Sequence, residues 1–188
     1  YESPVKIEKS KFVRSKSEDA LNLIRSKFTL NSLEFVDIYS DALDVDFSDG
    51  TILNSNFINV GNDSIDISGS NVIAKDIIIS ASGDKAISIG ERSNFQLSRS
   101  LISASSIGIA SKDFSKVFVT DLKTNKLKIC LAAYQKKNEY GPGYIKIGDP
   151  NNECQKKYIL ENGSSIISES EKYLPNTNNA YDLIYPAK

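Results

Sequence analysis

Apolar and polar residues alternate along short stretches of this chain, and the alternation returns at a constant interval. The leading apolar residue of each stretch lies 22 positions after the previous one, at Leu21, Leu43, Ile65, Ile87, Ile109 and Leu131. Alternation with a period of two is typical of a strand with one buried side. Its return at a fixed interval of this length is typical of a solenoid, in which each repeat is one coil.

Two further columns of apolar residues keep the same interval. The second comprises Leu23, Val45, Ile67, Ile89 and Ala133, and it is interrupted by Ser111. The third comprises Phe35, Phe57, Ile79 and Leu101. A coil of this length holds three short strands joined by turns and buries its apolar side chains by stacking on its neighbours, about 4.8 Å apart. We therefore predict an all-β fold, a right-handed parallel β-helix of about six to seven coils.

Turn-forming residues separate these strands at matching phases. They are Ser48-Asp49-Gly50, Gly61-Asn62-Asp63, Ser68-Gly69-Ser70-Asn71 and Ser82-Gly83-Asp84. Asn, Asp and Gly tolerate left-handed backbone and form local hydrogen bonds. Residues 17–25 have the local composition of a short helix, but their phase in the repeat predicts a strand.

The two ends of the chain are less regular. Val5 and Ile7 indicate an incomplete earlier coil, and the interval is lost after Ile147. We expect residues 1–149 to form the coils. Residues 150–188 are expected to add two strands around a turn within 158–167 and a tail, Pro175 to Lys188, that folds back as an irregular cap. Because the chain contains no Met, we expect it to be part of a larger polypeptide.

Composition narrows the possible partners. The net charge is −1, so no overall positive charge favours nucleic acid, and no apolar run is long enough to insert into a membrane. The chain has no His, which removes the commonest general base and zinc ligand. Cys130 and Cys154 lie about one coil apart, so either a disulfide or two free thiols fits the pattern.

Aspartates gather on the outward side of the first strand of each coil. One outward column holds Asn22, Asp44, Asp66 and Ser88, the next holds Asp46 and Lys112, and Asp41 and Asp63 precede them at the corner. Stacked carboxylates about 5 Å apart suit a calcium site, with Asp41, Asp44, Asp46, Asp63 and Asp66 as candidate ligands. They also suit a catalytic pair, with Asp44, Asp66 and Lys85 as candidates. A structural alternative is that the corner aspartates bond neighbouring backbone amides.

A second candidate site is the segment 134–144, which interrupts the regular coil. Its Tyr134, Lys136, Lys137 and Tyr140 are candidate contacts for a glycan or an acidic partner. A solvated turn shaped by Gly141-Pro142-Gly143 is the structural alternative.

The chain resembles the right-handed β-helix repeat regions of bacterial surface and secreted proteins, some of which are joined to a spore-coat-kinase-like domain. The resemblance rests on RSKSEDALNLIR (14–25), SDALDVDFSDG (40–50), VGNDSIDISG (60–69), GDKAISIGE (83–91), IGIASK (107–112) and AYQKKNEYGPG (133–143). It implies the fold and an extracellular or surface location, and it assigns no reaction.

The predicted fold is also similar to that of other β-helix proteins, namely pectate lyases, polygalacturonases, alginate epimerases and phage tailspikes, which act on or bind polysaccharides. The pectate-lyase-like arrangement implies calcium-binding acids at Asp41, Asp44, Asp63 and Asp66 and a base at Lys85. The polygalacturonase-like pattern needs a His that this chain lacks. This is an analogy between folds, and a fold does not determine a function.

We therefore expect a non-catalytic module of an extracellular or surface protein that is structural, glycan-binding or both. The alternative is a polysaccharide lyase or glycoside hydrolase that uses the acidic cluster, with calcium as its possible cofactor. A third interpretation is a structural domain that docks a protein partner by its exposed coil edge.

Overall fold

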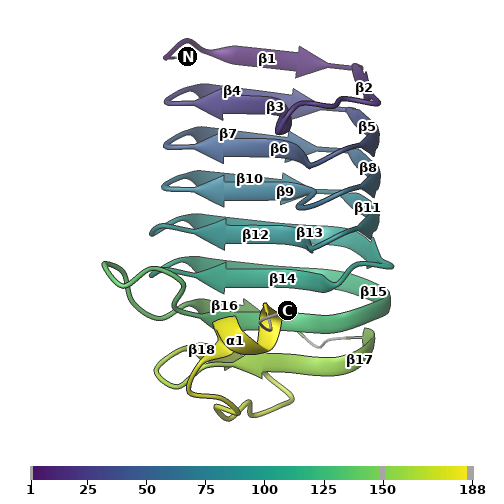
Figure 1. The fold of residues 1–188 in the computed structure, drawn as a ribbon. Coiled ribbons are helices and arrows are strands. Elements are labelled where there is room, and N and C mark those ends of the chain that lie inside the picture. Colours follow the sequence, from purple (N-terminus) through teal and green to yellow (C-terminus); the bar gives the residue numbers. More distant parts are fainter. Residues whose placement is uncertain (1, 149–150, 186–188) are drawn as a thin grey trace.

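The computed structural model describes residues 2–148 and 151–185. The chain forms a parallel β-solenoid of about seven turns with a spacing of about 22 residues, as the sequence predicted. Figure 1 shows the coils stacked from β1 at one end to β17 and β18 at the other. Within the described ranges, no helix has the length and apolar character that crossing a membrane requires.

The strands stack in three parallel series, which we call faces I, II and III. Face I comprises β3 (Asp19–Ile24), β6 (Asp41–Asp46), β9 (Ile65–Ser68), β12 (Lys85–Gly90), β14 (Ile107–Lys112) and the last parts of β15 (Lys116–Tyr134) and β17 (Asn151–Leu160). Face II comprises β1 (Val5–Glu8), β4 (Lys27–Asn31), β7 (Asp49–Leu53), β10 (Asn71–Lys75), the first parts of β13 (Asn94–Ser103) and β15, and then β16 (Tyr144–Ile147) and β18 (Ser165–Ile167). Face III comprises β2 (Lys11–Val13), β5 (Glu34–Ile38), β8 (Asn56–Val60), β11 (Ile78–Ser82), the remainder of β13, the middle of β15 and the start of β17.

The core consists of the apolar columns that the sequence predicted. Leu43, Ile65 and Ile87 are fully buried and lie opposite one another in the register. Ser111, which interrupts the second column, is also fully buried, and its hydroxyl donates to the carbonyl of Ser115 at 3.1 Å. This hydrogen bond removes the cost of placing a hydroxyl among apolar side chains.

The third column required one correction, because Ile102 rather than Leu101 follows Ile79. Ile102 is fully buried, whereas Leu101 is 38% exposed. The turn after β12 holds Glu91 and Arg92, both with positive φ, and it is one residue longer than the equivalent turn after β9. Asn71 therefore pairs with Asn94, although face I keeps its 22-residue interval.

A column of buried serines defines the corner between faces I and II. The backbone amides of Ser26, Ser48, Ser70 and Ser93 each donate to the hydroxyl of the next serine, at 2.9, 2.8, 3.1 and 3.2 Å. The residue before each serine has left-handed backbone, as at Phe47 with φ 49° and Gly69 with φ 60°. A left-handed residue followed by serine therefore turns the chain and satisfies the amide of the neighbouring coil.

The solenoid continues beyond the point at which the sequence appeared to lose its interval. Ile159 pairs with Ala132, and Ser165 pairs with Tyr144, so β17 and β18 each add to the preceding coil. Residues 135–143 form a loop that interrupts the repeat without ending it. Cys130 and Cys154 are joined in a disulfide within this region, with Cα atoms 5.8 Å apart.

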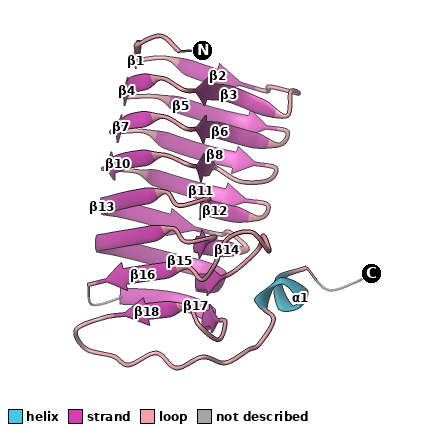
Figure 2. Cartoon of the chain, turned by 90° about the vertical axis from the view of Figure 1, so that its left-hand side faces the viewer, coloured by secondary structure: helices cyan, strands magenta, loops and turns pink. Residues whose placement is uncertain are grey.

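The tail occupies a different place from the predicted cap. The short helix α1 (Ala180–Ile184) packs against the outward side of face I, where Ala180 is fully buried. Figure 2 shows α1 standing beside the stack rather than beneath it. Part of the expected cap, residues 186–188, lies outside the described residues. Upstream, Tyr173 packs into the core of the last coil.

The serine column generates a stability prediction. The hydroxyl of Ser48 accepts from the amide of Ser26 and donates to the carbonyl of Asp46 at 2.8 Å. Ser48→Ala leaves a buried amide unsatisfied and should lower the free energy of unfolding by about 1–3 kcal/mol. Chemical denaturation measures this, with the exposed Ser17→Ala as control. Equal stability of the two variants would contradict the proposed role of the corner serines.

Candidate functional site

The outward side of face I carries three columns of side chains, in the register that the sequence predicted. The first runs from Asp19 through Asp41 to Asp63, Lys85 and Ile107, the second from Asn22 through Asp44, Asp66 and Ser88 to Ala110, and the third from Ile24 through Asp46, Ser68 and Gly90 to Lys112 and Tyr134. The side chains are acidic in the first coils and become basic, small or apolar further along.

Asp41 and Asp63 act as corner residues. Asp41 Oδ1 accepts from the amide of Asp63 at 2.8 Å and from Asn62 Nδ2 at 2.7 Å. Asp63 Oδ1 accepts from the amide of Lys85 at 2.8 Å. Each carboxylate therefore satisfies the backbone of the next coil, which is the structural alternative considered for the corner aspartates.

Lys85 is buried and surrounded by acids. Its Nζ lies 3.4 Å from Asp63 Oδ2, contacts Asp84 Oδ2 and sits 5.2 Å from the centre of the Tyr185 ring. Burial alone would lower the pKa of Lys85, but Asp63 and Asp84 outweigh it and raise the pKa. Lys85 is therefore a charged ammonium at neutral pH, and in this state it cannot accept a proton as a base.

Within the described part of the chain, no backbone amide donates to the carboxyl groups of Asp44, Asp46 and Asp66, and together with Asp19 they form what we call the acidic patch. Asn22 Nδ2 bridges two of the acids, at 3.0 Å from Asp44 Oδ2 and 3.1 Å from Asp19 Oδ2. Burial and then the charges of Asp46 and Asp66 raise the pKa of Asp44 to about 8. Burial and Asp66 also raise the pKa of Asp46. Asp44 is thus largely protonated at neutral pH.

The other half of face I is closed by α1 and by tyrosine side chains. Ala180 and Tyr134 pack with Ile107, Ala110 and Ala132, and every residue of β12 and β14 is buried. Hydrogen bonds at both ends of α1 hold it in place. The amide of Ala180 donates to Glu161 Oε2 at 2.8 Å, and Tyr185 donates to Asp84 Oδ2 at 2.9 Å.

Polar side chains without partners collect at the boundary between the two halves. Asp66 Oδ1, Ser88 Oγ and Tyr134 OH are buried and have no hydrogen-bond partner among the residues that the structure describes. Lys112 is 6% exposed, and its side chain crosses Gly90, where an added Cβ would lie 3.8 Å from Nζ. Burial lowers the pKa of Lys112, and the charge of Asp66 opposes this. We call Asp66, Ser88, Lys112 and Tyr134 the boundary cluster.

The loop residues predicted as ligand contacts do not share one surface. Tyr134 ends β15 and is fully buried, whereas Lys136 is exposed. Lys137 pairs with Glu91, and the Tyr140 ring lies 5.6 Å from the guanidinium of Arg92. Asp113 Oδ1 anchors the loop by accepting the amides of Lys136 and Lys137 at 2.7 and 2.8 Å.

The predicted calcium site remains a prediction. Among the residues that the structure describes, no group of three or more His, Cys, Asp or Glu side chains is arranged to hold a metal ion. The carboxylates that would supply ligands divide instead between the corner and the acidic patch.

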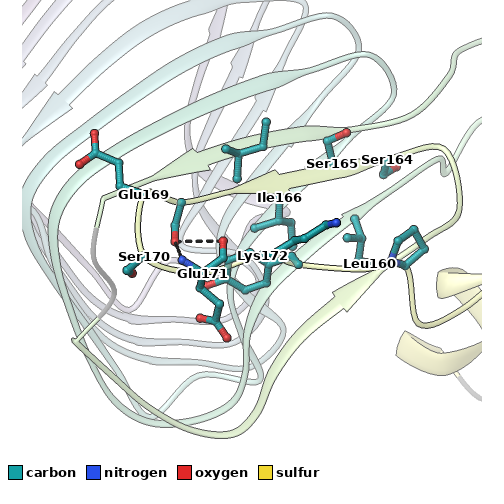
Figure 3. Close-up of a pocket in the computed structure, with 12 residues that line it drawn as sticks. Leu160, Ser164, Ser165, Ile166, Glu169, Ser170, Glu171 and Lys172 are labelled. Carbon is teal, nitrogen blue, oxygen red and sulfur yellow. Dashed lines mark hydrogen bonds between the residues drawn. The ribbon is translucent and has the colours of Figure 1, made fainter.

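A hollow at the end of the last coil lies away from face I. Its walls include Leu160, Ile166, Glu169 and Lys172 (Figure 3). Glu171 there is held by Ser168, whose hydroxyl accepts its amide at 3.0 Å, and by an ion pair with Lys157. The polar groups of this hollow thus stabilise a turn, and the candidate site is placed on face I.

Sequence reasoning placed Ser88 and Lys112 in the outward columns without treating them as site residues. Both side chains are buried, which the repeat does not predict. The signal that could have indicated them is the change from an acidic residue, Asp46, to a basic one, Lys112, along the third column. No family model, curated protein or solved structure matches the chain. The fold and site define it by class alone, as a parallel β-solenoid with an acidic patch bordered by buried lysines.

The raised pKa of Asp44 predicts how stability depends on pH. The unfolded carboxyl ionises near 3.8 and the folded one near 8. Between these values the folded state keeps a proton that the unfolded state releases, so stability falls as pH rises, and the loss is complete above pH 8. Asp44→Asn should remove about 1–2 kcal/mol of this decline, since solvent screens a partly exposed group.

Denaturation midpoints from pH 5 to 9 measure the effect. Asp76→Asn is the control, because its partner Arg99 lowers the pKa of Asp76 and keeps it ionised throughout this range. Parallel pH profiles for wild type and Asp44→Asn would contradict the assignment.

Proposed function

We propose that this chain is a non-catalytic β-solenoid module of a bacterial extracellular or surface protein, and that it binds a neutral polysaccharide along face I. One observation carries the proposal. The strand β6 presents Asp41, Asp44 and Asp46 outward between two exposed aromatic residues, Tyr39 (75% exposed) and Phe47 (56% exposed). Carboxyl groups accept and donate hydrogen bonds to hydroxyls, and aromatic rings offer apolar faces to sugar rings.

The scaffold supports this role because it is rigid. Phe47 packs over Gly69, where an added Cβ would lie 2.6 Å from Phe47 Cδ1, so the ring is held against the next coil. Strand pairing on both sides fixes the positions of the carboxyl groups of β6. Groups that are positioned before binding lose little entropy on binding.

The charge of the site indicates which sugars it accepts. A uronate would bring a further negative charge to the acidic patch, whose carboxyl groups already raise the pKa of Asp44 and Asp46. A neutral sugar avoids this repulsion. The extracellular location is supported by the disulfide between Cys130 and Cys154, since disulfides persist in oxidising compartments.

Calorimetric titration with cellotetraose, mannotetraose, xylotetraose and tetragalacturonate tests the proposal. We expect binding of at least one neutral tetrasaccharide, weaker or absent binding of tetragalacturonate, and about a tenfold loss in Phe47→Ala. The control is Phe118→Ala, which removes an aromatic ring that is 39% exposed on face II. The proposal fails if no neutral sugar binds, or if the two variants lose affinity equally.

A second candidate function is glycoside hydrolysis, and the protonated state of Asp44 favours it. Asp44 and Asp66 are opposite each other on adjacent coils, about 4.8 Å apart at the backbone. That spacing is close to the roughly 5–5.5 Å between the acid and the nucleophile of retaining glycosidases. Asp44 would act as the acid and Asp66 as the nucleophile.

Release of reducing sugar from the same neutral substrates distinguishes the two candidates. The non-catalytic proposal predicts none. If the wild type releases sugar and the double variant Asp44→Ala/Asp66→Ala does not, the hydrolase candidate is supported. Activity that survives the double substitution would exclude this pair as the catalytic residues, and Asp37→Ala/Asp76→Ala on the other faces is the control.

A further inference from the structure

The corner between faces I and II repeats one arrangement of an arginine and a phenylalanine. The residues that precede the successive corner serines are Arg25, Phe47, Gly69, Arg92 and Phe114. The guanidinium of each arginine lies 5.8 Å from the centre of the phenylalanine ring on the following coil. The surroundings of Phe47 therefore recur around Phe114, three coils further along the stack.

Each of the two rings also lies against a glycine that follows it in the stack. A Cβ added to Gly69 would lie 2.6 Å from Phe47 Cδ1, and a Cβ added to Gly141 would clash with the Phe114 ring. A side chain at either glycine would thus displace the ring. Gly141 belongs to the loop 135–143, so the loop provides for Phe114 the support that the regular coil provides for Phe47.

Phenylalanine is an unfavourable residue for this corner. Phe47 and Phe114 have φ of 49° and 63°, in the left-handed region that bulky side chains rarely adopt. Their rings remain 56% and 46% exposed, so the fold leaves much of their apolar surface unused. Strained residues of this kind concentrate at functional sites. A ligand explains why an exposed ring, held between an arginine and a glycine, occurs twice at the same corner.

The distance between the two rings fits a chain-like ligand. Three coil steps separate Phe47 from Phe114, about 14 Å at the inter-strand spacing of about 4.8 Å. One sugar residue of an extended polysaccharide is nearly as long as one coil step. A polysaccharide that follows the axis of the solenoid therefore reaches both rings, whereas a disaccharide reaches only one.

We propose that Phe47 and Phe114 are two equivalent platforms for one neutral polysaccharide chain, which runs along this corner parallel to the axis of the solenoid. The inference rests on the proposed function and deepens it, since it assigns the direction of the bound chain and the length that it needs. At each platform the ring offers its apolar surface to a sugar ring, and Arg25 or Arg92 can donate hydrogen bonds to the sugar hydroxyls. Tyr140, whose ring lies 5.6 Å from the guanidinium of Arg92, adds a second ring at the Phe114 platform.

The dependence of affinity on ligand length tests the two platforms. Calorimetric titrations compare cellobiose with cellohexaose, mannobiose with mannohexaose and xylobiose with xylohexaose. In the series that binds, the hexasaccharide should bind at least about tenfold more tightly than the disaccharide, because its second contact is intramolecular. Phe114→Ala should remove this gain but lower the disaccharide affinity no more than about twofold, since the Phe47 platform remains. The double variant Phe47→Ala/Phe114→Ala should bind neither ligand.

Three further variants separate loss of the ring from loss of the fold. Phe114→Leu keeps an apolar side chain against Gly141, so it should unfold at the wild-type temperature and still lose the hexasaccharide gain. Phe114→Tyr keeps an aromatic ring and should retain the gain. Phe118→Ala, on face II, is the control and should bind both ligands as the wild type does.

The outcomes distinguish this inference from the proposed function. If Phe47→Ala weakens hexasaccharide binding but Phe114→Ala and Phe114→Leu do not, the second platform is wrong and the proposed function stands. The same conclusion follows if the wild type binds the disaccharide and the hexasaccharide equally well. If no neutral saccharide binds the wild type, both proposals fail. Loss of the hexasaccharide gain in Phe114→Leu, with the gain retained in Phe114→Tyr, supports both.

Discussion

The hydrogen bond from each corner amide to the serine hydroxyl of the next coil is the contact on which the rest of the structure depends. It couples neighbouring coils at the turn between faces I and II, where the strand ladder is interrupted by a left-handed residue. Because each serine also bonds its own coil, as Ser70 does to the carbonyl of Ser68, the contact between coils is kept at this corner, even across the longer turn before Ser93. Face I keeps its interval where faces II and III gain a residue.

This constant register determines the electrostatics of face I. Like side chains stand above one another at the coil spacing, and stacked carboxylates repel. Each column relieves the repulsion differently. Asp41 and Asp63 bond backbone amides of the following coil, Asn22 bridges Asp19 and Asp44, and Asp44 holds a proton. Of these three arrangements, only the protonation of Asp44 leaves a carboxyl group available for chemistry. The candidate site therefore lies in the column that contains Asp44 and Asp66.

The periodic part of the molecule was predictable from the sequence, and the parts that depend on distant segments were not. The columns beginning at Leu21 and Leu23 follow from one interval, and the structure confirms them. The shift from Leu101 to Ile102 depends on two consecutive left-handed residues, Glu91 and Arg92, which no interval reveals. The burial of Tyr134 depends on α1, which returns to face I from outside the repeat and packs against it. The corner serines recur in the sequence at nearly the same interval, but the sequence analysis treated them as turn formers and did not predict that their hydroxyls bond the neighbouring coil.

The division of face I into an open and a closed half links the fold to the proposed function. On an uninterrupted solenoid, the same outward columns would be solvated along their whole length, and water would satisfy Ser88 and Lys112. The tail changes this by covering β12 and β14 and anchoring through Asp84 and Glu161. Ser88 and Tyr134, at the edge of the covered area, are removed from solvent without gaining a hydrogen-bond partner among the described residues. The backbone ladders make the scaffold stable enough to keep such groups. Such groups cost stability without supporting the fold, and they lie at the end of the acidic patch, next to the surface on which the proposed function depends.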